Sequence, residues 1–233
     1  MRGPEGTEVK VTVVRNEEEI EFNITREKIK FNYISSEVLE NNVGYIKISS
    51  FEGNCANDFE EAYKELEGKG IKSLIIDLRN NGGGLVDQCL DIADLIVPKG
   101  ATTLITVDKE KNEEVSKSNK EPIINMPIVV LVNEYTASAS EILTGAIKEN
   151  VEASVVGTTT YGKGVIQGIY LLSDKKTGLK VTIQEYFTPN RNKIHKTGIT
   201  PDYEIELPEE WQGKSTVEKE YDTQLQKAIE LLK

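Results

Sequence analysis

The fold of this chain is decided by the stretch PIVVLVNEYTASASEILTGAIK, residues 127–148. Its first six residues form an apolar run typical of a buried strand, and Ile142 to Lys148 carry apolar side chains at helical spacing. Between the two, the segment TASASE places Ser138 at the corner of a strand, a sharp turn and a helix. The pattern therefore predicts a hydroxyl side chain at a helix start.

A second stretch repeats this layout. Residues 73–78, SLIIDL, are short, branched and nearly all apolar, as expected for a central strand covered on both faces. The turn RNNGGG follows at residues 79–84, and a helix is predicted from Leu85 to Ile96, before Pro98. Strands that alternate with helices indicate an α/β domain, and we expect the two turns to face one another.

The other predicted elements come from the same periodicities. They are a hairpin over residues 8–14 and 19–24, strands over 29–34, 43–49, 151–157, 165–172 and 179–187, and helices over 58–67 and 218–233. Residues 109–122 are charged and weakly apolar, which predicts an exposed loop.

Composition excludes several classes of protein. The 233 residues carry a formal net charge of -11, which opposes binding to nucleic acid. No apolar run approaches the ~20 residues that span a bilayer. Cys55 and Cys89, with His195 as the single histidine, do not have the spacing of a metal site. We expect two partly buried thiols, with one bridge in an oxidising compartment as the alternative.

A serine hydroxyl becomes a strong nucleophile when a base takes its proton. His195 lies in a charged segment and is predicted to be a surface residue. Lys163 stands between two glycines, whose neighbours can close over its stem, and burial favours the neutral amine that a base requires. Gln167 follows four residues later, on the same side of an extended strand, and can orient that amine. The residues suggest a Ser-Lys pair with Ser138 as its nucleophile.

The developing oxyanion of such a reaction needs fixed N–H donors. Ala139 follows Ser138 at a helix start, where backbone N–H groups have no partner within the helix. The glycines at 82–84 allow a carbonyl oxygen to approach the main chain, and Gly84 is the preferred second donor.

Structural interpretations compete with this one. Ser138 and Glu141 also fit a capping box, the glycine triplet fits an ordinary turn, and Gly-Lys-Gly fits a loop. Residues 157–163 match the start of a phosphate-binding P-loop, GxxxxGK. That match breaks at Gly164, which replaces the Ser or Thr of the motif, and at the strand predicted where the motif has a helix. The combination of motifs favours the Ser-Lys site.

Three linked motifs, TASASE at 136–141, GKGxxQ at 162–167 and DLRNNGGG at 77–84, resemble those of the C-terminal processing peptidases, or tail-specific proteases. The resemblance covers nearly the whole chain, including GITPD at 198–202 and DTQL at 222–225. It implies an α/β core of mixed sheets and helices related to crotonase and Clp protease. It also implies a serine endopeptidase that cuts near the C-terminus of unfolded or tail-exposed proteins.

By motif position, the resemblance implies that Ser138 is the nucleophile, Lys163 the general base and Gln167 its orienting residue. The backbone N–H groups of Gly84 and Ala139 become the oxyanion donors. The family uses no metal and no organic cofactor, so none is expected here.

The family also carries a PDZ domain that binds the substrate's C-terminus. Residues 1–26 resemble only the final stretch of such a domain with its connecting strands, and residues 27–233 form the expected protease core. A latent, inactive core that binds peptides or acts in assembly is therefore the alternative function. The family works outside the cytoplasm, in the periplasm or at the outer face of a membrane. The expected partners are protein or peptide substrates. For the full-length protein, the resemblance is also compatible with a homodimer and with a position near a membrane.

Overall fold

The computed structural model describes residues 1–28, 31–173, 176–214 and 217–233. The chain divides into two compact units, Met1–Asn32 and Tyr33–Lys233, and the larger one carries all three motifs. The sequence predicts the boundary a few residues earlier, after residue 26.

The small unit is the predicted hairpin. Strands β1 (Glu8–Arg15) and β2 (Glu18–Thr25) pair antiparallel. Asn16 and Glu17, which join them, have positive φ angles of 53° and 67°, the pattern of a two-residue type I′ turn. The apolar residues fall opposite one another on one face, with Val11 facing Phe22 at the centre of the ladder.

The large unit is built on a six-stranded sheet in the order β12-β9-β8-β5-β4-β3. Its strands are β3 (Ile34–Val38), β4 (Val43–Ile48), β5 (Ser73–Asp77), β8 (Ile128–Val132), β9 (Ala153–Gly157) and β12 (Tyr203–Glu204). Among the described strands of this sheet, only β3 is antiparallel to its neighbour. Every residue of β5 and of β8 is buried, which explains why both read as continuous apolar runs.

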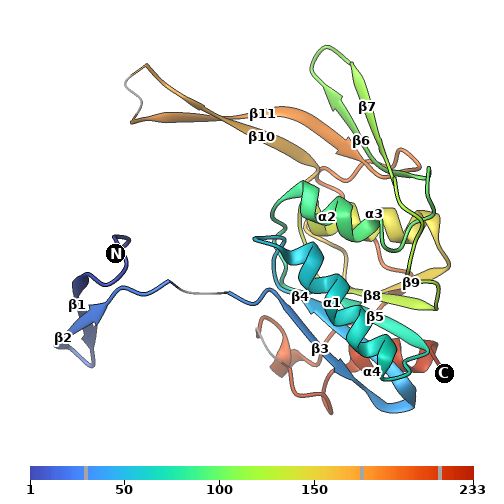
Figure 1. Ribbon diagram of the computed structural model, residues 1–233, viewed down its shortest axis with the longest axis horizontal. Helices are drawn as coiled ribbons and strands as arrows, with labels where there is room; N and C mark the ends of the chain where they lie inside the picture. The colour runs from blue at the N-terminus through green and yellow to red at the C-terminus, as the bar shows by residue number, and fades with distance from the viewer. Residues whose placement is uncertain (29–30, 174–175, 215–216) are drawn as a thin grey trace. The chain divides into compact units, whose positions relative to one another are not determined.

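Helices cover both faces of this sheet (Figure 1). They are α1 (Cys55–Gly68), α2 (Val86–Ala93), α3 (Ala139–Asn150) and α4 (Thr223–Leu231), with short 3₁₀ turns at Glu40–Asn42 and Glu209–Trp211. The first three pack in the main core with Leu74 and Ile76, whereas α4 packs on Ile75 from the opposite face. Successive side chains of β5 therefore point to opposite faces of the sheet, as expected for a strand covered on two sides.

A second sheet, antiparallel throughout, has the order β10-β11-β6-β7. Its strands are β6 (Thr102–Asp108), β7 (Glu113–Lys117), β10 (Val165–Leu171) and β11 (Gly178–Phe187). Strands β10 and β11 form a long arm that projects from this sheet (Figure 1).

The mixed α/β class is confirmed, but several element predictions are wrong. The strand expected over 29–34 begins only at Ile34, and residues 29 and 30 lie outside the described residues. The predicted loop over 109–122 contains β7, whose charged residues suit a sheet edge, and β6 was not predicted. Helix α2 ends at Ala93 instead of Ile96. In the described part of the chain, no helix is long and apolar enough to cross a membrane.

Candidate active site

Ser138 lies in the turn between β8 and α3, as the N-cap of the helix. Its backbone has φ 60° and ψ -120°, a conformation that side-chain-bearing residues rarely adopt. The turn is held by hydrogen bonds to the glycine-rich loop. Thr136 Oγ1 donates to the Leu78 carbonyl at 2.9 Å, and Ala137 N donates to the Asn81 carbonyl at 3.0 Å. A strained serine at a strand-to-helix turn is a common arrangement for a nucleophile.

Asn81 joins the two turns, and the expectation that they face one another is confirmed. Its side-chain amide donates to the Ile48 carbonyl at 2.9 Å, and its Oδ1 accepts from Gly83 N at 2.9 Å. Its own carbonyl accepts from Ser140 Oγ at 3.0 Å as well as from Ala137 N. Ser140 is therefore engaged in a structural hydrogen bond beneath the turn.

Gly83 lies against the nucleophile turn, and Gly84 lies against Phe51, in the segment that follows β4. A Cβ at Gly83 would lie 2.8 Å from Ser138 Cβ and 3.0 Å from Ala139 N, and its φ is 102°. A Cβ at Gly84 would lie 2.4 Å from the Phe51 carbonyl oxygen. Within the described residues, no acceptor pairs with the backbone N–H of Gly84 or of Ala139. Two unpaired donors therefore belong to the two segments that meet at Ser138.

Glu141 connects the nucleophile turn to the segment that carries Lys163. Its carboxylate is fully buried and accepts four hydrogen bonds. Oε2 accepts from Ser138 N and from Lys163 N, both at 2.9 Å. Oε1 accepts from Thr160 Oγ1 at 2.6 Å and from Gly162 N at 2.7 Å. One carboxylate oxygen therefore bridges the main chains of the predicted nucleophile and the predicted base.

The glycines around Lys163 pack on the turn at residues 194–198. Gly162 has φ 83°, and its carbonyl accepts from Lys196 N at 2.8 Å. A Cβ at Gly164 would lie 2.4 Å from His195 N. His195 is thus half-buried against Gly164, and its Nδ1 is buried without a partner among the described residues. Its prediction as a surface residue is wrong, because a charged stretch of sequence does not reveal what packs on its backbone.

Gln167 lies on β10 at an exposed position. Strand β10 begins at Val165, after Lys163, and its register with β11 shifts between Ile166 and Gln167. The alternation that would place Lys163 and Gln167 on one side is therefore interrupted. No hydrogen bond joins the two side chains in the part of the chain that the structure describes.

Tyr186, on β11, is a site residue that the sequence did not reveal. Its buried hydroxyl donates to the carbonyl of Lys163. Burial raises the pKa of Tyr186, the charge of Glu141 raises it further, and a hydrogen bond with the Ser138 side chain acts in the opposite direction. No local motif marks this tyrosine, since it comes from the second sheet and from 48 residues beyond Ser138 (186 minus 138).

The two cysteines are free, and both are fully buried, whereas the sequence predicts partly buried thiols. Cys89 Sγ lies 3.1 Å from the carbonyl oxygen of Ala139, as a thiol donor beneath the first turn of α3. Burial raises the pKa of Cys89, and burial with the charge of Asp58 raises the pKa of Cys55 to about 12. Both thiols are therefore packing groups.

An ion-pair network anchors the start of the glycine-rich loop. Arg79 Nη2 lies 2.7 Å from Asp77 Oδ2, and its Nη1 lies 2.8 Å from Asp222 Oδ1, the N-cap of α4. Burial acts to raise the pKa of Asp77, but Arg79 outweighs it and holds that pKa below its ordinary value. Tyr45 donates to the same carboxylate at 2.6 Å. The loop that presents Gly83 and Gly84 is thus tied to the C-terminal helix.

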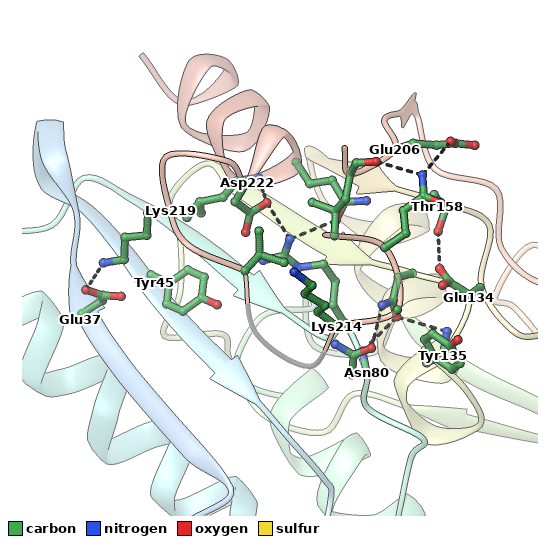
Figure 2. Close-up of a pocket in the computed structure, with 18 residues that line it drawn as sticks. Glu37, Tyr45, Asn80, Glu134, Tyr135, Thr158, Glu206, Lys214, Lys219 and Asp222 are labelled. Atoms are coloured by element: carbon green, nitrogen blue, oxygen red, sulfur yellow. Dashed lines mark hydrogen bonds and ion pairs between the residues drawn. The ribbon is translucent and has the colours of Figure 1, made fainter. Parts of the chain in front are cut away.

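A cavity of about 380 Å³ opens beside this network (Figure 2). Its lining includes Asn80 and Tyr135, from the two facing turns, together with Lys214 and Asp222. Neither Ser138 nor Lys163 is among its lining residues. Among the described residues, no group of three or more His, Cys, Asp or Glu side chains could hold a metal ion.

Comparison with known proteins identifies the family of the chain. The sequence profile described as "Peptidase family S41" matches residues 42–205, the span that contains all of the site residues described above except Asp222 and Lys214. This chain belongs to peptidase family S41. The profile covers well over half of the chain and includes both facing turns and the Lys163 segment.

Relatives of this S41 chain are processing proteases. It is 39% identical to the carboxyl-terminal-processing protease of Synechocystis sp., over 100% of this chain and 55% of that protein. It is 38% identical to the carboxy-terminal processing protease CtpA of Bacillus subtilis, over 90% of this chain and 45% of that protein. The chain thus spans about half the length of these relatives.

A solved structure shares the fold. The photosystem II D1 C-terminal processing protease superimposes with a TM-score of 0.70 and 30% identity, over 88% of this chain and 58% of that one. The family resemblance inferred from the motifs is therefore confirmed, together with the mixed α/β core.

Proposed function

We propose that this S41 chain is a serine endopeptidase in which Ser138 is the nucleophile and Lys163 the general base. The observation that carries the proposal is the bridge made by Glu141, whose Oε2 accepts from the backbone N–H of both residues at 2.9 Å. A buried carboxylate with two such bonds fixes two segments that are 25 residues apart in sequence (163 minus 138). Proximity of this kind is what a nucleophile and its base require.

The reaction follows from these positions. Neutral Lys163 Nζ removes the proton of Ser138 Oγ, which attacks the carbonyl carbon of the scissile peptide bond. The resulting tetrahedral oxyanion accepts hydrogen bonds from the free N–H groups of Gly84 and Ala139. Lys163 then returns the proton to the leaving amine, and the peptide bond breaks to give an acyl-serine. Water, activated by the same lysine, hydrolyses the ester and restores the serine.

Two side chains orient the pair. We assign to Gln167 the role of directing the Lys163 amine, on the spacing of the motif. Hydrogen bonds of this kind often form only in the substrate complex. Tyr186 supports the same pair, since its hydroxyl donates to the Lys163 carbonyl. It acts as a positioning residue in this proposal.

The names of the relatives support a substrate class. We propose that the chain cuts unfolded or tail-exposed proteins near their C-termini, as a processing protease, and that it works outside the cytoplasm. We further propose that residues 1–26, which contain the hairpin β1–β2, derive from the end of a PDZ domain. The charge of -11 fits substrates that are neutral or basic around the cleaved bond.

The test is cleavage of reduced, unfolded casein by the parent chain and by Ser138→Ala, Lys163→Ala and Ser140→Ala variants. Matched circular dichroism spectra establish that each variant folds. We expect the Ser138 and Lys163 variants to lose cleavage, and Ser140→Ala to keep it at reduced stability, because Ser140 is bonded to Asn81. Cleavage that survives Ser138→Ala would refute the assignment. An inert parent would favour the latent core.

A further inference from the structure

We propose that the free edge of β10 is a docking strand for substrate, which binds there as an added β-strand with uncharged, apolar side chains. This inference rests on the proposed function, because it assigns the surface that presents a polypeptide to Ser138. It concerns the arm formed by β10 and β11, of which the proposed catalytic site uses only Gln167 and Tyr186.

The first observation is the position of β10 in its sheet. In the order β10-β11-β6-β7, β10 lies at one edge, and in the described part of the chain only β11 pairs with it. One row of its main-chain N–H and C=O groups is therefore open. The strand begins at Val165, two residues after Lys163, so this open row leads directly away from the proposed base.

The second observation is the composition of that edge. Residues 165–172, VIQGIYLL, contain no charged residue and no proline. The opposite edge of the same sheet, β7, reads EEVSK and carries three charges in five residues. Charged side chains are a usual means of preventing edge-to-edge pairing. The same sheet therefore has one edge protected against an added strand and one edge open to it.

The third observation is the exposure of apolar side chains along β10. Ile169 is 71% exposed and Leu171 is 70% exposed. They share one face of the arm, where β11 places Lys180 and Gly178 opposite them. The other face carries Tyr170 opposite Leu179, both more than half exposed. An added strand would cover apolar side chains on both faces of the ribbon.

The chemistry of the edge selects its occupant. Main-chain pairing recognises any extended polypeptide, and alternate side chains add the preference for apolar residues. A second copy of the chain fits less well. Stable dimers bury roughly 1,200 Å² or more, whereas seven paired residues make a contact only ~23 Å long. Each copy also carries a charge of -11. Continuity with Lys163 favours a substrate chain that is bound transiently.

The test measures binding in a Ser138→Ala background, so that cleavage does not enter the result. The probe is a fluorescein-labelled twelve-residue peptide of alternating Val and Thr with a lysine at each end, followed by fluorescence anisotropy. The control probe has proline at every second position and cannot donate a ladder of hydrogen bonds. We expect the first peptide to bind and the second not to bind.

Two matched variants locate the contact. Ile169→Lys places a charge on the open edge, and Val115→Lys places the same charge on β7, where Val115 is 40% exposed. Both side chains lie at the surface, so both variants should fold. We expect Ile169→Lys to weaken peptide binding by about fivefold or more, and Val115→Lys to leave it unchanged.

Hydrogen exchange gives an independent readout. Bound peptide should slow exchange of the backbone amides in residues 165–171 and leave residues 113–117 unaffected. Equal binding by Ile169→Lys and the parent, or protection confined to other segments, would overturn the proposal. Protection of β10 that grows with protein concentration in the absence of peptide would also overturn it, in favour of a second copy. Loss of this binding and loss of cleavage by Ser138→Ala are separate results, so the two proposals fail separately.

Discussion

Replacement of Glu141 by glutamine tests the bridge between the nucleophile and base segments. Glutamine has nearly the same shape, but one of its two terminal atoms is an NH₂ group that donates hydrogen bonds instead of accepting them. Each carboxylate oxygen of Glu141 accepts two hydrogen bonds, and three of the four donors are backbone N–H groups. The amide must therefore leave at least one buried donor without an acceptor.

The geometry indicates which donor is lost. If the NH₂ group replaces Oε1, it can donate to Thr160 Oγ1, which already accepts from Ile199 N, and Gly162 N is left unpaired. If it replaces Oε2, Ser138 N and Lys163 N both lose their acceptor. The first orientation is less costly. The unpaired N–H of Gly162 costs about 1–3 kcal/mol. The two bonds that remain on Oε2 each weaken by about 1 kcal/mol, because their acceptor no longer carries a negative charge. We expect Glu141→Gln to lower the free energy of unfolding by about 3–5 kcal/mol.

Urea unfolding, followed by the fluorescence of the single tryptophan, Trp211, measures this loss. The matched control is Glu134→Gln, an exposed carboxylate with one side-chain partner, Thr158 at 3.1 Å, where we expect less than about 0.5 kcal/mol. Cleavage of a peptide substrate should show kcat reduced about a hundredfold for Glu141→Gln, because the base segment shifts relative to Ser138. Unfolding and kcat values equal to those of Glu134→Gln would refute the reasoning.

Three other substitutions or treatments have definite expected outcomes. Gly83→Ala should lower the free energy of unfolding in urea by about 3 kcal/mol or more and abolish cleavage, because the φ of Gly83 is 102° and the new Cβ would meet Ser138. Gly82 has open space around it, so Gly82→Ala should keep the stability and activity of the parent. Tyr186→Phe keeps the ring and loses a buried hydroxyl, so we expect about 1 kcal/mol of destabilisation and a lower kcat with little change in KM; an unchanged kcat would exclude its positioning role. Burial holds the thiol pKa of Cys55 at about 12 and raises that of Cys89, so iodoacetamide at pH 8 should leave the native chain unlabelled and add two groups in urea, which intact mass would show.

Much of the fold could be predicted because it is encoded by local patterns. Strands β5 and β8 are nearly continuous apolar runs, and apolar and polar residues alternate along the hairpin β1–β2. The period and length of these patterns are therefore sufficient to predict the strands. Strand β7 was missed because an edge strand buries little, and a charged sequence such as EEVSK carries no apolar period. The predicted position of β3 is several residues too early in the sequence for the same reason, since four of the five residues of the strand are exposed.

The site divides in the same way. Sequence spacing marked Ser138 and Lys163, but it could not show how they are joined. The sequence pattern fits Glu141 as half of a capping box, and its carboxylate does accept from Ser138 N. Its other bonds reach residues 160–163, which no local pattern connects to it. Arg79 likewise finds its partner Asp222 at a separation of 143 residues. Contacts of this kind come from the packing of distant segments.

The position of Tyr186 connects the catalytic pair to the second sheet. Its hydroxyl contacts the Lys163 carbonyl, and its backbone N–H donates to the Gly164 carbonyl at 3.0 Å. Lys163 is therefore held by Glu141 from the first turn of α3 and by Tyr186 from β11, the strand that pairs with β10. A polypeptide bound along β10 would be fixed to the same sheet that fixes the base. Docking and catalysis would then share one rigid support, which is the arrangement that positioning of a scissile bond requires.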